Sequence, residues 1–215
     1  RNMSKDRIHI PKASTLMGSL RSMGYSFESA VADVIDNSIS AHAKNIRILF
    51  PSTPLDELAI GILDDGDGMK GDVLFEAMRY GCLSAEEERV EDDLGRFGMG
   101  MKSASLSQCR CLTVVSFDGN TLNGFTWDYN HIIKTQDWII QELEKYEIDK
   151  LPYIEKLKEQ KKGTLVIWQD FDVIYNSSGG QVYSTLVDLR SSLENTLALI
   201  YHRFLSITGV QRLHM

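Results

Sequence analysis

The chain has 215 residues, of which 43% are hydrophobic and 25% are charged, a balance typical of a globular protein that buries a core. Its net charge of -7 disfavours a domain that binds nucleic acid by itself, because such domains are usually basic. No apolar run approaches the roughly 18 residues that a membrane-spanning helix needs, and the three cysteines and five scattered histidines disfavour a zinc site. We expect a cytoplasmic protein with one large domain or two small ones.

Two helices are predicted near the start of the chain. Ser14 can cap the first, and Ser26 can cap the second, which covers residues 27–41. On the second helix Asp33 and Asn37 are four residues apart, so they lie one above the other on a single face. A pair of solvent-exposed polar residues is the plainer interpretation, and a ligand-binding pair is the alternative.

Two strands are predicted next, over residues 46–50 and 58–63. The second is a largely apolar run, which favours a central strand. It leads directly into the sequence Asp-Asp-Gly-Asp-Gly-Met at residues 64–69. A carboxylate such as that of Asp64 at the edge of a sheet, followed by glycines that let a flat group approach the backbone, favours a ligand site. An acidic turn is the alternative, and a calcium loop is disfavoured because a glycine and a methionine interrupt its ligand positions.

A glycine-rich loop, Gly95-Arg-Phe-Gly-Met-Gly100, follows a short helix predicted over residues 72–80 and an acidic stretch at 81–93. The acidic stretch has few large apolar residues, so we expect a mobile flap. Glycines let backbone N–H groups approach an anion, and the helix that follows directs its positive end at it. Met101 stands where a P-loop has lysine, so the loop is not that motif. Alone, it fits a phosphate cradle and a turn equally well.

The second half of the chain is predicted to contain three strands and three helices. The strands are expected at residues 111–117, 121–129 and 163–168, and the helices at 138–146, 153–160 and 182–205. The first two strands form a hairpin through a tight turn. The segment between them and the last strand, residues 130–162, is a charged insertion.

Four motifs now stand in one order. They are Asp33-x-x-x-Asn37 on a helix, Asp64-x-Gly66-x-Gly68 after a strand, Gly95-x-x-Gly98-x-Gly100 before a helix, and Gly163-Thr164 opening a strand. This order resembles the GHKL ATPase superfamily: gyrase B subunits, ninety-kilodalton heat-shock chaperones, histidine kinases, MutL-type mismatch-repair proteins and MORC proteins. The runs at residues 32–38, 97–104 and 163–168 look closest to the MORC and chaperone branches. The resemblance implies a two-layer α/β sandwich, the Bergerat fold, with a mixed sheet that carries helices on one face.

The resemblance also implies roles in binding ATP and Mg²⁺. Asn37 would hold Mg²⁺ through its side-chain oxygen, Asp64 would accept a hydrogen from the adenine amino group, and Thr164 would support Asp64 or a bridging water. The other residues implied to line the nucleotide are Ala41, Gly66, Gly68, Met69, Gly95, Phe97, Gly98, Met99, Gly100, Met101 and Lys102, the last of them near the β- or γ-phosphate. Residues 81–97 would form the ATP lid.

Asp33 stands where the family usually has a catalytic glutamate. Aspartate is one methylene shorter, about 1.5 Å, and a misplacement of about 1 Å can cost roughly 100-fold in rate. We therefore expect slow ATP hydrolysis. The alternative is a nucleotide-sensing module without significant turnover. Phosphotransfer of the histidine-kinase type is less favoured, because no dimerisation helix with a phosphoacceptor histidine precedes the first motif.

The predicted domains are an ATP-binding domain over residues 3–181 and a connecting helix over residues 182–215. In the family that the sequence resembles, a transducer domain follows the ATPase domain, and this sequence contains no complete one. We therefore expect this chain to be the amino-terminal ATPase domain of a longer protein. Nucleotide-dependent homodimerisation is expected there, with residues 3–24 contributing to the contact. No membrane contact is expected, and nucleic acid would be bound only through other domains.

Overall fold

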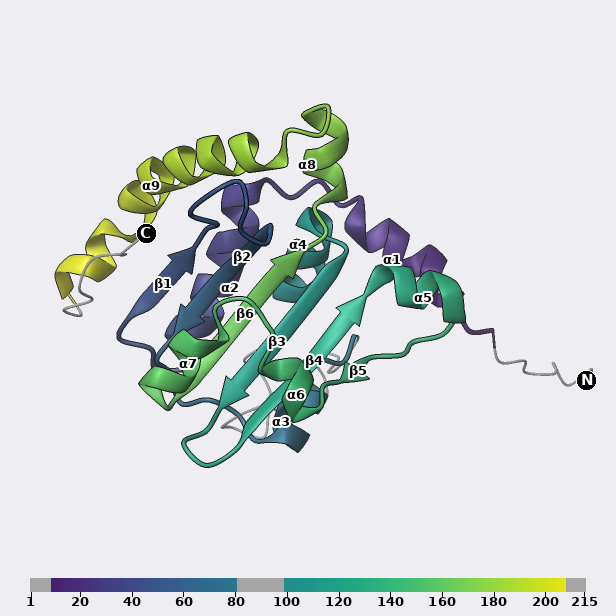
Figure 1. Cartoon of the computed structure of the whole chain (residues 1–215), viewed down its shortest axis with the longest axis horizontal. Coiled ribbons are helices and arrows are strands. Elements are labelled where there is room, and N and C mark those ends of the chain that lie inside the picture. Colours follow the sequence, from purple (N-terminus) through teal and green to yellow (C-terminus); the bar gives the residue numbers. More distant parts are fainter. Residues whose placement is uncertain (1–8, 81–98, 208–215) are drawn as a thin grey trace, which may run out of the picture.

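An antiparallel sheet organises this computed structural model, which describes residues 9–80 and 99–207 (Figure 1). In spatial order its strands are β1 (Ile46–Leu49), β2 (Ala59–Asp64), β6 (Gly163–Gln169), β3 (Cys111–Phe117), β4 (Leu122–Asp128) and β5 (Gln141–Glu142). Every neighbouring pair among these strands is antiparallel, which corrects the expected mixed sheet. β2 pairs on both sides, as its apolar sequence predicted.

Most of the helices form the second layer of the sandwich (Figure 1). The helices of the described residues are α1 (Ala13–Arg21), α2 (Phe27–Ser40), α3 (Gly71–Ala77), α4 (Met99–Gln108), α5 (Tyr129–Thr135), α6 (Lys145–Ile148), α7 (Ile154–Gln160), α8 (Asp172–Ser177) and α9 (Val182–Ile207). α4 packs against both α1 and α2, and residues 101–108 are all buried. Within the described part of the chain, no helix has the length and apolar character needed to cross a membrane.

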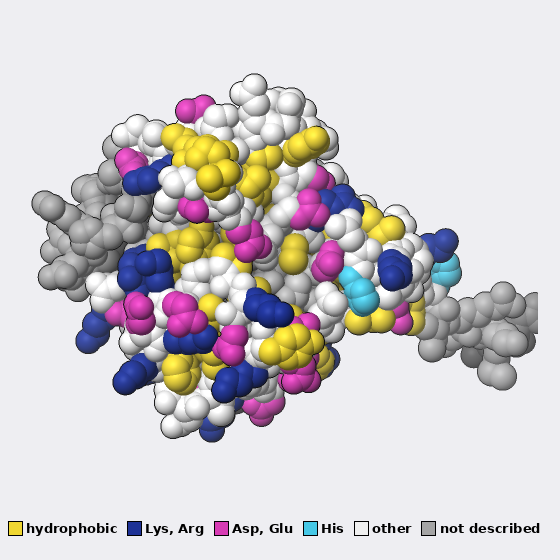
Figure 2. Space-filling model, viewed as in Figure 1, with side chains coloured by type: hydrophobic (Ala, Val, Ile, Leu, Met, Phe, Trp, Pro, Cys, Tyr) yellow, Lys and Arg dark blue, Asp and Glu magenta, His cyan; other side chains and the backbone are white. Residues whose placement is uncertain are grey.

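The later part of the charged insertion, with α6 and α7, covers the opposite face of the sheet. This corrects the expectation that helices lie on one face only. Sheet residues and residues of α6 and α7 form a second apolar cluster there: Ala59, Leu63, Val115, Ile148, Ile154, Leu157, Leu165 and Ile167. Tyr153 packs over Gly61, where an added Cβ would lie 2.7 Å from the tyrosine ring. Figure 2 shows basic and acidic side chains interspersed over this face of the molecule.

Of the two helix caps predicted from serines, one is present and the other is not. The Ser26 hydroxyl accepts a hydrogen bond from the N–H of Ser29 at 3.1 Å, so it caps α2 as predicted. Ser14 does not cap α1, which begins one residue earlier; its hydroxyl instead donates to the Gln136 side chain at 2.9 Å. The Ser14 hydroxyl therefore makes a tertiary contact with Gln136 instead of capping the helix.

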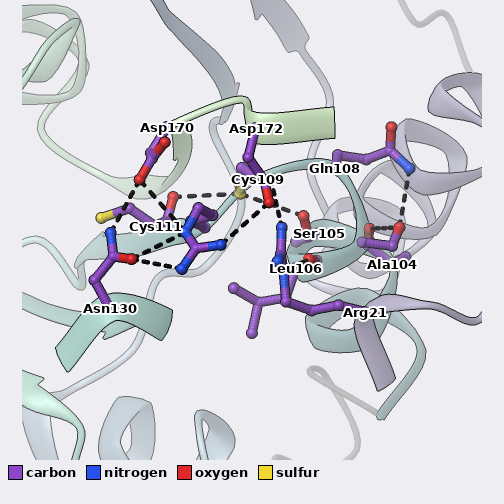
Figure 3. Close-up of polar contacts among 12 residues, drawn as sticks. Arg21, Ala104, Ser105, Leu106, Gln108, Cys109, Cys111, Asn130, Asp170 and Asp172 are labelled. Carbon is purple, nitrogen blue, oxygen red and sulfur yellow. Dashed lines mark hydrogen bonds and ion pairs between the residues drawn. The ribbon is translucent and has the colours of Figure 1, made fainter. Parts of the chain in front are cut away.

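Arg21 links α1 to the end of α4 and to Asp172 of α8 (Figure 3), and Arg110, which follows α4, shares Asp172 as a partner. Arg21 donates through Nε to the Leu106 carbonyl at 2.8 Å and pairs with Asp172 at 2.5 Å. Arg110 also pairs with Asp172, at 3.3 Å, and both guanidinium groups lie 4.8 Å from the centre of the Tyr129 ring. Burial by itself would raise the pKa of Asp172, but the two arginines hold that pKa below its usual value.

Replacing Arg21 by leucine should lower the free energy of unfolding by about 2 kcal/mol, because Asp172 and the Leu106 carbonyl lose a partly buried charged donor. Urea unfolding followed by circular dichroism measures this. The matched control is Arg190→Leu, which breaks an exposed pair with Glu194 on α9 and should cost no more than about 0.5 kcal/mol. Equal losses in the two variants would contradict a fastening role for Arg21.

Candidate functional site

A small cleft opens where β2 ends, between α2 and β6. Its lining residues are Val34, Asn37, Ser38, Ala41, Asp64, Met69, Thr164 and Val166. Three of the motifs singled out in the sequence therefore meet in one place, since Asn37, Asp64 and Thr164 each belong to a different one. The predicted lining residues Ala41 and Met69 are also present.

Asp64 is the buried carboxylate of this cleft and is only 5% exposed. Its Oδ2 accepts from the Ser38 hydroxyl at 2.8 Å, and its Oδ1 accepts from the N–H groups of Gly66 and Thr164 at 2.9 and 3.2 Å. Burial raises the pKa of Asp64 to about 6, although these hydrogen bonds lower it. At neutral pH the side chain is therefore mainly an ionised acceptor.

Hydroxyl groups behind Asp64 hold the segment that follows β2. Ser116 of β3 lies 2.8 Å from the Thr164 hydroxyl and accepts from the N–H of Met69 at 2.8 Å. The contact from Thr164 to Asp64 is made by the backbone N–H, whereas the Thr164 hydroxyl lies against Ser116. Hydrogen bonds from β3 therefore hold two residues of the cleft lining, Thr164 of β6 and Met69.

Three glycines are required by the close packing of this segment. A Cβ on Gly66 would lie 2.7 Å from the Ala41 carbonyl oxygen, and one on Gly68 would lie 2.1 Å from the Phe117 carbonyl oxygen. Gly163, at the start of β6, has a φ of +120°, and a Cβ there would lie 1.9 Å from the Asp64 carbonyl oxygen. Larger residues would push the segment that follows Asp64 away from the end of α2 and from β3, and would separate β6 from Asp64.

Asp33 and Asn37 lie one helical turn apart on α2, as predicted. The Asn37 side-chain amide donates through Nδ2 to the Asp33 carbonyl at 2.9 Å. This hydrogen bond within the helix uses the amide nitrogen and not the side-chain oxygen. Gly100, in the first turn of α4, approaches the Asp33 carboxylate, and a Cβ there would lie 3.5 Å from Oδ2. Burial, with a smaller contribution from the Asp36 charge, raises the pKa of Asp33 above its usual value.

Two residues of α4 that were predicted to line the nucleotide, Met101 and Lys102, do not line the cleft. Met101 is 1% exposed and belongs to the main apolar core rather than to the cleft. Lys102 is 2% exposed, and its ammonium donates to the carbonyls of Ala77, at 2.8 Å, and Arg79 at the end of α3. This corrects the expectation that Lys102 reaches a phosphate.

Part of the predicted site cannot be placed. Gly95, Phe97, Gly98 and the predicted lid at 81–97 lie outside the described residues, as does the side chain of Met99. Within residues 9–80 and 99–207, no cluster of three or more histidine, cysteine, aspartate or glutamate side chains could hold a metal ion.

Two residues that hydrogen-bond to the cleft lining, Ser38 and Ser116, were not predicted from the sequence. Ser38 lies one turn beyond Val34 on the buried side of α2, so a serine that continues an apolar stripe was the available signal. Ser116 lies directly opposite Thr164 in the pairing of β3 with β6. That register depends on the fold, and a single sequence does not reveal it.

Two comparisons with known proteins gave matches to this chain. Residues 25–164 match the family model of histidine kinase-, DNA gyrase B- and HSP90-like ATPases, a range that begins before Asp33 and ends at Thr164. Over 115 residues, or 52% of this chain, the sequence is 27% identical to MORC family CW-type zinc finger protein 3 of Mus musculus. The matched region covers only 12% of that relative.

Proposed function

Because the chain belongs to the family of histidine kinase-, DNA gyrase B- and HSP90-like ATPases, we propose that it binds Mg²⁺-ATP in the cleft beside Asp64 and hydrolyses it slowly. The observation that carries the proposal is the buried Asp64 carboxylate, which Ser38, Gly66 and Thr164 hold in a cleft with apolar walls. An adenine base offers an amino donor to this acceptor and flat apolar faces to the walls.

The residues present fit both parts of the ligand. Gly66 keeps the backbone close to Ala41, where a side chain would fill the cleft, and Asn37 offers an amide oxygen of the kind that Mg²⁺ accepts. The backbone of Gly95, Gly98 and Gly100 would bind the phosphates. When bound, Mg²⁺ supplies positive charge that offsets charge developing on the phosphates.

Hydrolysis would depend on Asp33. Its carboxylate would take a proton from the water that attacks the γ-phosphorus as the bond from that phosphorus to the bridging β-phosphate oxygen breaks. ADP and phosphate would then leave, and Asp33 would release the proton to solvent. The raised pKa of Asp33 makes the carboxylate a stronger base than an exposed aspartate. Its short side chain sets the water at a less favourable distance, which is the reason for slow turnover.

We further propose that ATP orders residues 81–97 as a lid and brings two copies of the chain together through residues 3–24. Hydrolysis would release them. The family match over residues 25–164 includes the proposed lid. Sedimentation velocity with a non-hydrolysable ATP analogue should show a dimer that is absent with ADP, and identical sedimentation in both states would contradict it for this chain.

Titration calorimetry with Mg²⁺-ATP and Mg²⁺-GTP tests the binding site itself. ATP should bind in the micromolar range. GTP should bind about 100-fold or more weakly, because guanine presents a carbonyl acceptor where the Asp64 carboxylate needs a donor. Absence of ATP binding, or equal affinity for the two nucleotides, would overturn the proposed base pocket.

The affinity for Mg²⁺-ATP should also depend on the ionisation of Asp64. Because the pKa of Asp64 is raised to about 6, protonation below that pH turns Oδ2 into a donor, which is mismatched with the adenine amino group. The association constant should therefore fall about tenfold between about pH 7 and about pH 5. Calorimetric titration across this range measures the midpoint.

Ser38→Ala is the matched control for this pH dependence. The Ser38 hydrogen bond lowers the pKa of Asp64, so its loss should move the midpoint of ATP binding to higher pH. Ionisation of ATP itself is the same with both proteins and cancels in the comparison. An unmoved midpoint would show that the pH dependence does not come from Asp64.

A further inference from the structure

The C-terminal end of α3 is held by side chains from two other elements. The carbonyls of Ala77 and Arg79 accept hydrogen bonds from the Lys102 ammonium. The carbonyl of Met78, which lies between them in the chain, accepts from Trp127 Nε1 at 2.8 Å. Three successive carbonyls at the end of this helix are therefore satisfied by two side chains.

Lys102 makes these contacts from inside the protein. Its ammonium also lies 5.6 Å from the centre of the Tyr80 ring, and that ring packs against Trp127 and Trp138 with centroids 5.3 and 5.9 Å apart. Burying an ammonium is costly unless it is compensated. The negative end of α3 and the face of an aromatic ring both compensate it here.

The contact joins two elements that flank the cleft. α3 begins at Gly71, shortly after Met69 of the cleft lining, and α4 carries Lys102 one turn into the helix. The first turn of α4 also carries Gly100, which approaches Asp33. The position of this turn relative to Asp33 is therefore tied, through the Lys102 ammonium, to the end of α3.

We propose that Lys102 is a positioning residue of the nucleotide site: it sets the start of α4 beside Asp33 by holding the end of α3, and it does not contact phosphate. The inference rests on the proposed ATP binding. By the same reasoning Trp127 is a positioning residue too, because its indole N–H donates to the neighbouring carbonyl of Met78.

A double-mutant cycle with Mg²⁺-ATP calorimetry tests the inference. Lys102→Met and Trp127→Phe should each weaken ATP binding, by about tenfold for a displacement below 1 Å. The double variant should lose less than the product of the two, because both residues hold one helix end. A direct lysine–phosphate contact predicts instead that Trp127→Phe binds like wild type, and that result would overturn the inference.

Tryptophan emission of the ligand-free protein gives a second readout. Trp127 and Trp138 lie beside Tyr80, so Lys102→Met should shift their emission before any nucleotide is added. Lys134→Met, at an exposed position on α5, is the control and should change neither emission nor affinity. Emission and affinity that stay unchanged in Lys102→Met would also overturn the inference.

The outcomes separate this inference from the proposed function. A wild-type chain that binds no ATP contradicts the proposed function itself. A wild-type chain that binds ATP, together with a Lys102→Met variant of equal affinity, contradicts only the positioning role. If Lys102→Met does not fold, Trp127→Phe decides alone: weaker ATP binding supports the role, and unchanged binding overturns it.

Discussion

Asp64→Asn is expected to abolish nucleotide binding while leaving the fold intact. The introduced amide can keep its oxygen toward the N–H groups of Gly66 and Thr164, which hydrogen-bond to Asp64 Oδ1. Its NH₂ group then replaces Oδ2 and presents a donor to the adenine amino donor. A site built around one hydrogen bond rejects a mismatched partner strongly, so we expect a loss of about 100-fold or more in ATP affinity.

The same substitution should not destabilise the protein at neutral pH. The Ser38 hydroxyl, which donates to Asp64 Oδ2, also lies 3.3 Å from the Val34 carbonyl and can donate there when it accepts from the new amide. The pKa of Asp64 is raised from 3.8 to about 6, so the folded state binds the proton more tightly than the unfolded state. Stability is therefore lost as the pH rises from about 4 to about 6, and above that the ionised carboxylate costs about 3 kcal/mol, which a neutral amide removes.

Asp65→Asn is the matched control for Asp64→Asn. Burial by itself would raise the pKa of Asp65, but hydrogen bonds from Asn45 and Lys44 hold it below its usual value. Its loss should lower stability and leave ATP affinity unchanged, the opposite pattern to Asp64→Asn. Calorimetry and urea unfolding at about pH 8 measure both effects, and wild-type affinity in Asp64→Asn would remove Asp64 from the base pocket.

Elements with strong local signals were predicted well from the sequence. The Ser26 cap and the apolar stripe of α2 placed that helix to within a residue of its observed bounds. β2 and β6 were found from short apolar runs bounded by glycine and aspartate. These signals act within a few residues of the chain, so a single sequence contains them.

The charged insertion was predicted less well because tertiary contacts decide its structure. A helix was expected around residues 138–146, but this stretch contains β5, in which Gln141 pairs with Thr126 of β4. Trp138 and Ile140 pack against the main core, which explains their apolar character without a helix. The pairing direction of the sheet likewise depends on connections that the strand sequences do not specify.

The candidate site shows the same division between local and distant information. Asp33, Asn37 and Asp64 belong to motifs whose spacing predicted their elements, and the structure brings Asn37 and Asp64 to one cleft. Lys102 belongs to such a motif too, but the end of α3 determines where its ammonium lies. A motif identifies a residue type at a position, whereas the direction of a long side chain depends on its tertiary partners.

Asp33→Glu is expected to raise the rate of ATP hydrolysis by up to about 100-fold, because the longer side chain moves the carboxylate about 1.5 Å toward the attacking water. The neighbouring position has room for it, since Gly100 has no side chain and even an added Cβ would lie 3.5 Å from Asp33 Oδ2. ATP affinity should change little, because Asp64 and Asn37 are untouched.

Steady-state phosphate release by Asp33→Glu, Asp33→Asn and Asp36→Glu separates an ATPase from a nucleotide sensor. Asp36→Glu makes the same chemical change at an exposed position on α2 and should leave the rate at the wild-type value. Asp33→Asn cannot accept a proton and should reduce turnover to background. A faster Asp33→Glu variant would show that the site is arranged for hydrolysis and limited by the length of one side chain. If turnover is the same in all three variants and in wild type, Asp33 does not act as the base. If that common rate is also the background rate, the site binds ATP without hydrolysing it, as a nucleotide sensor would.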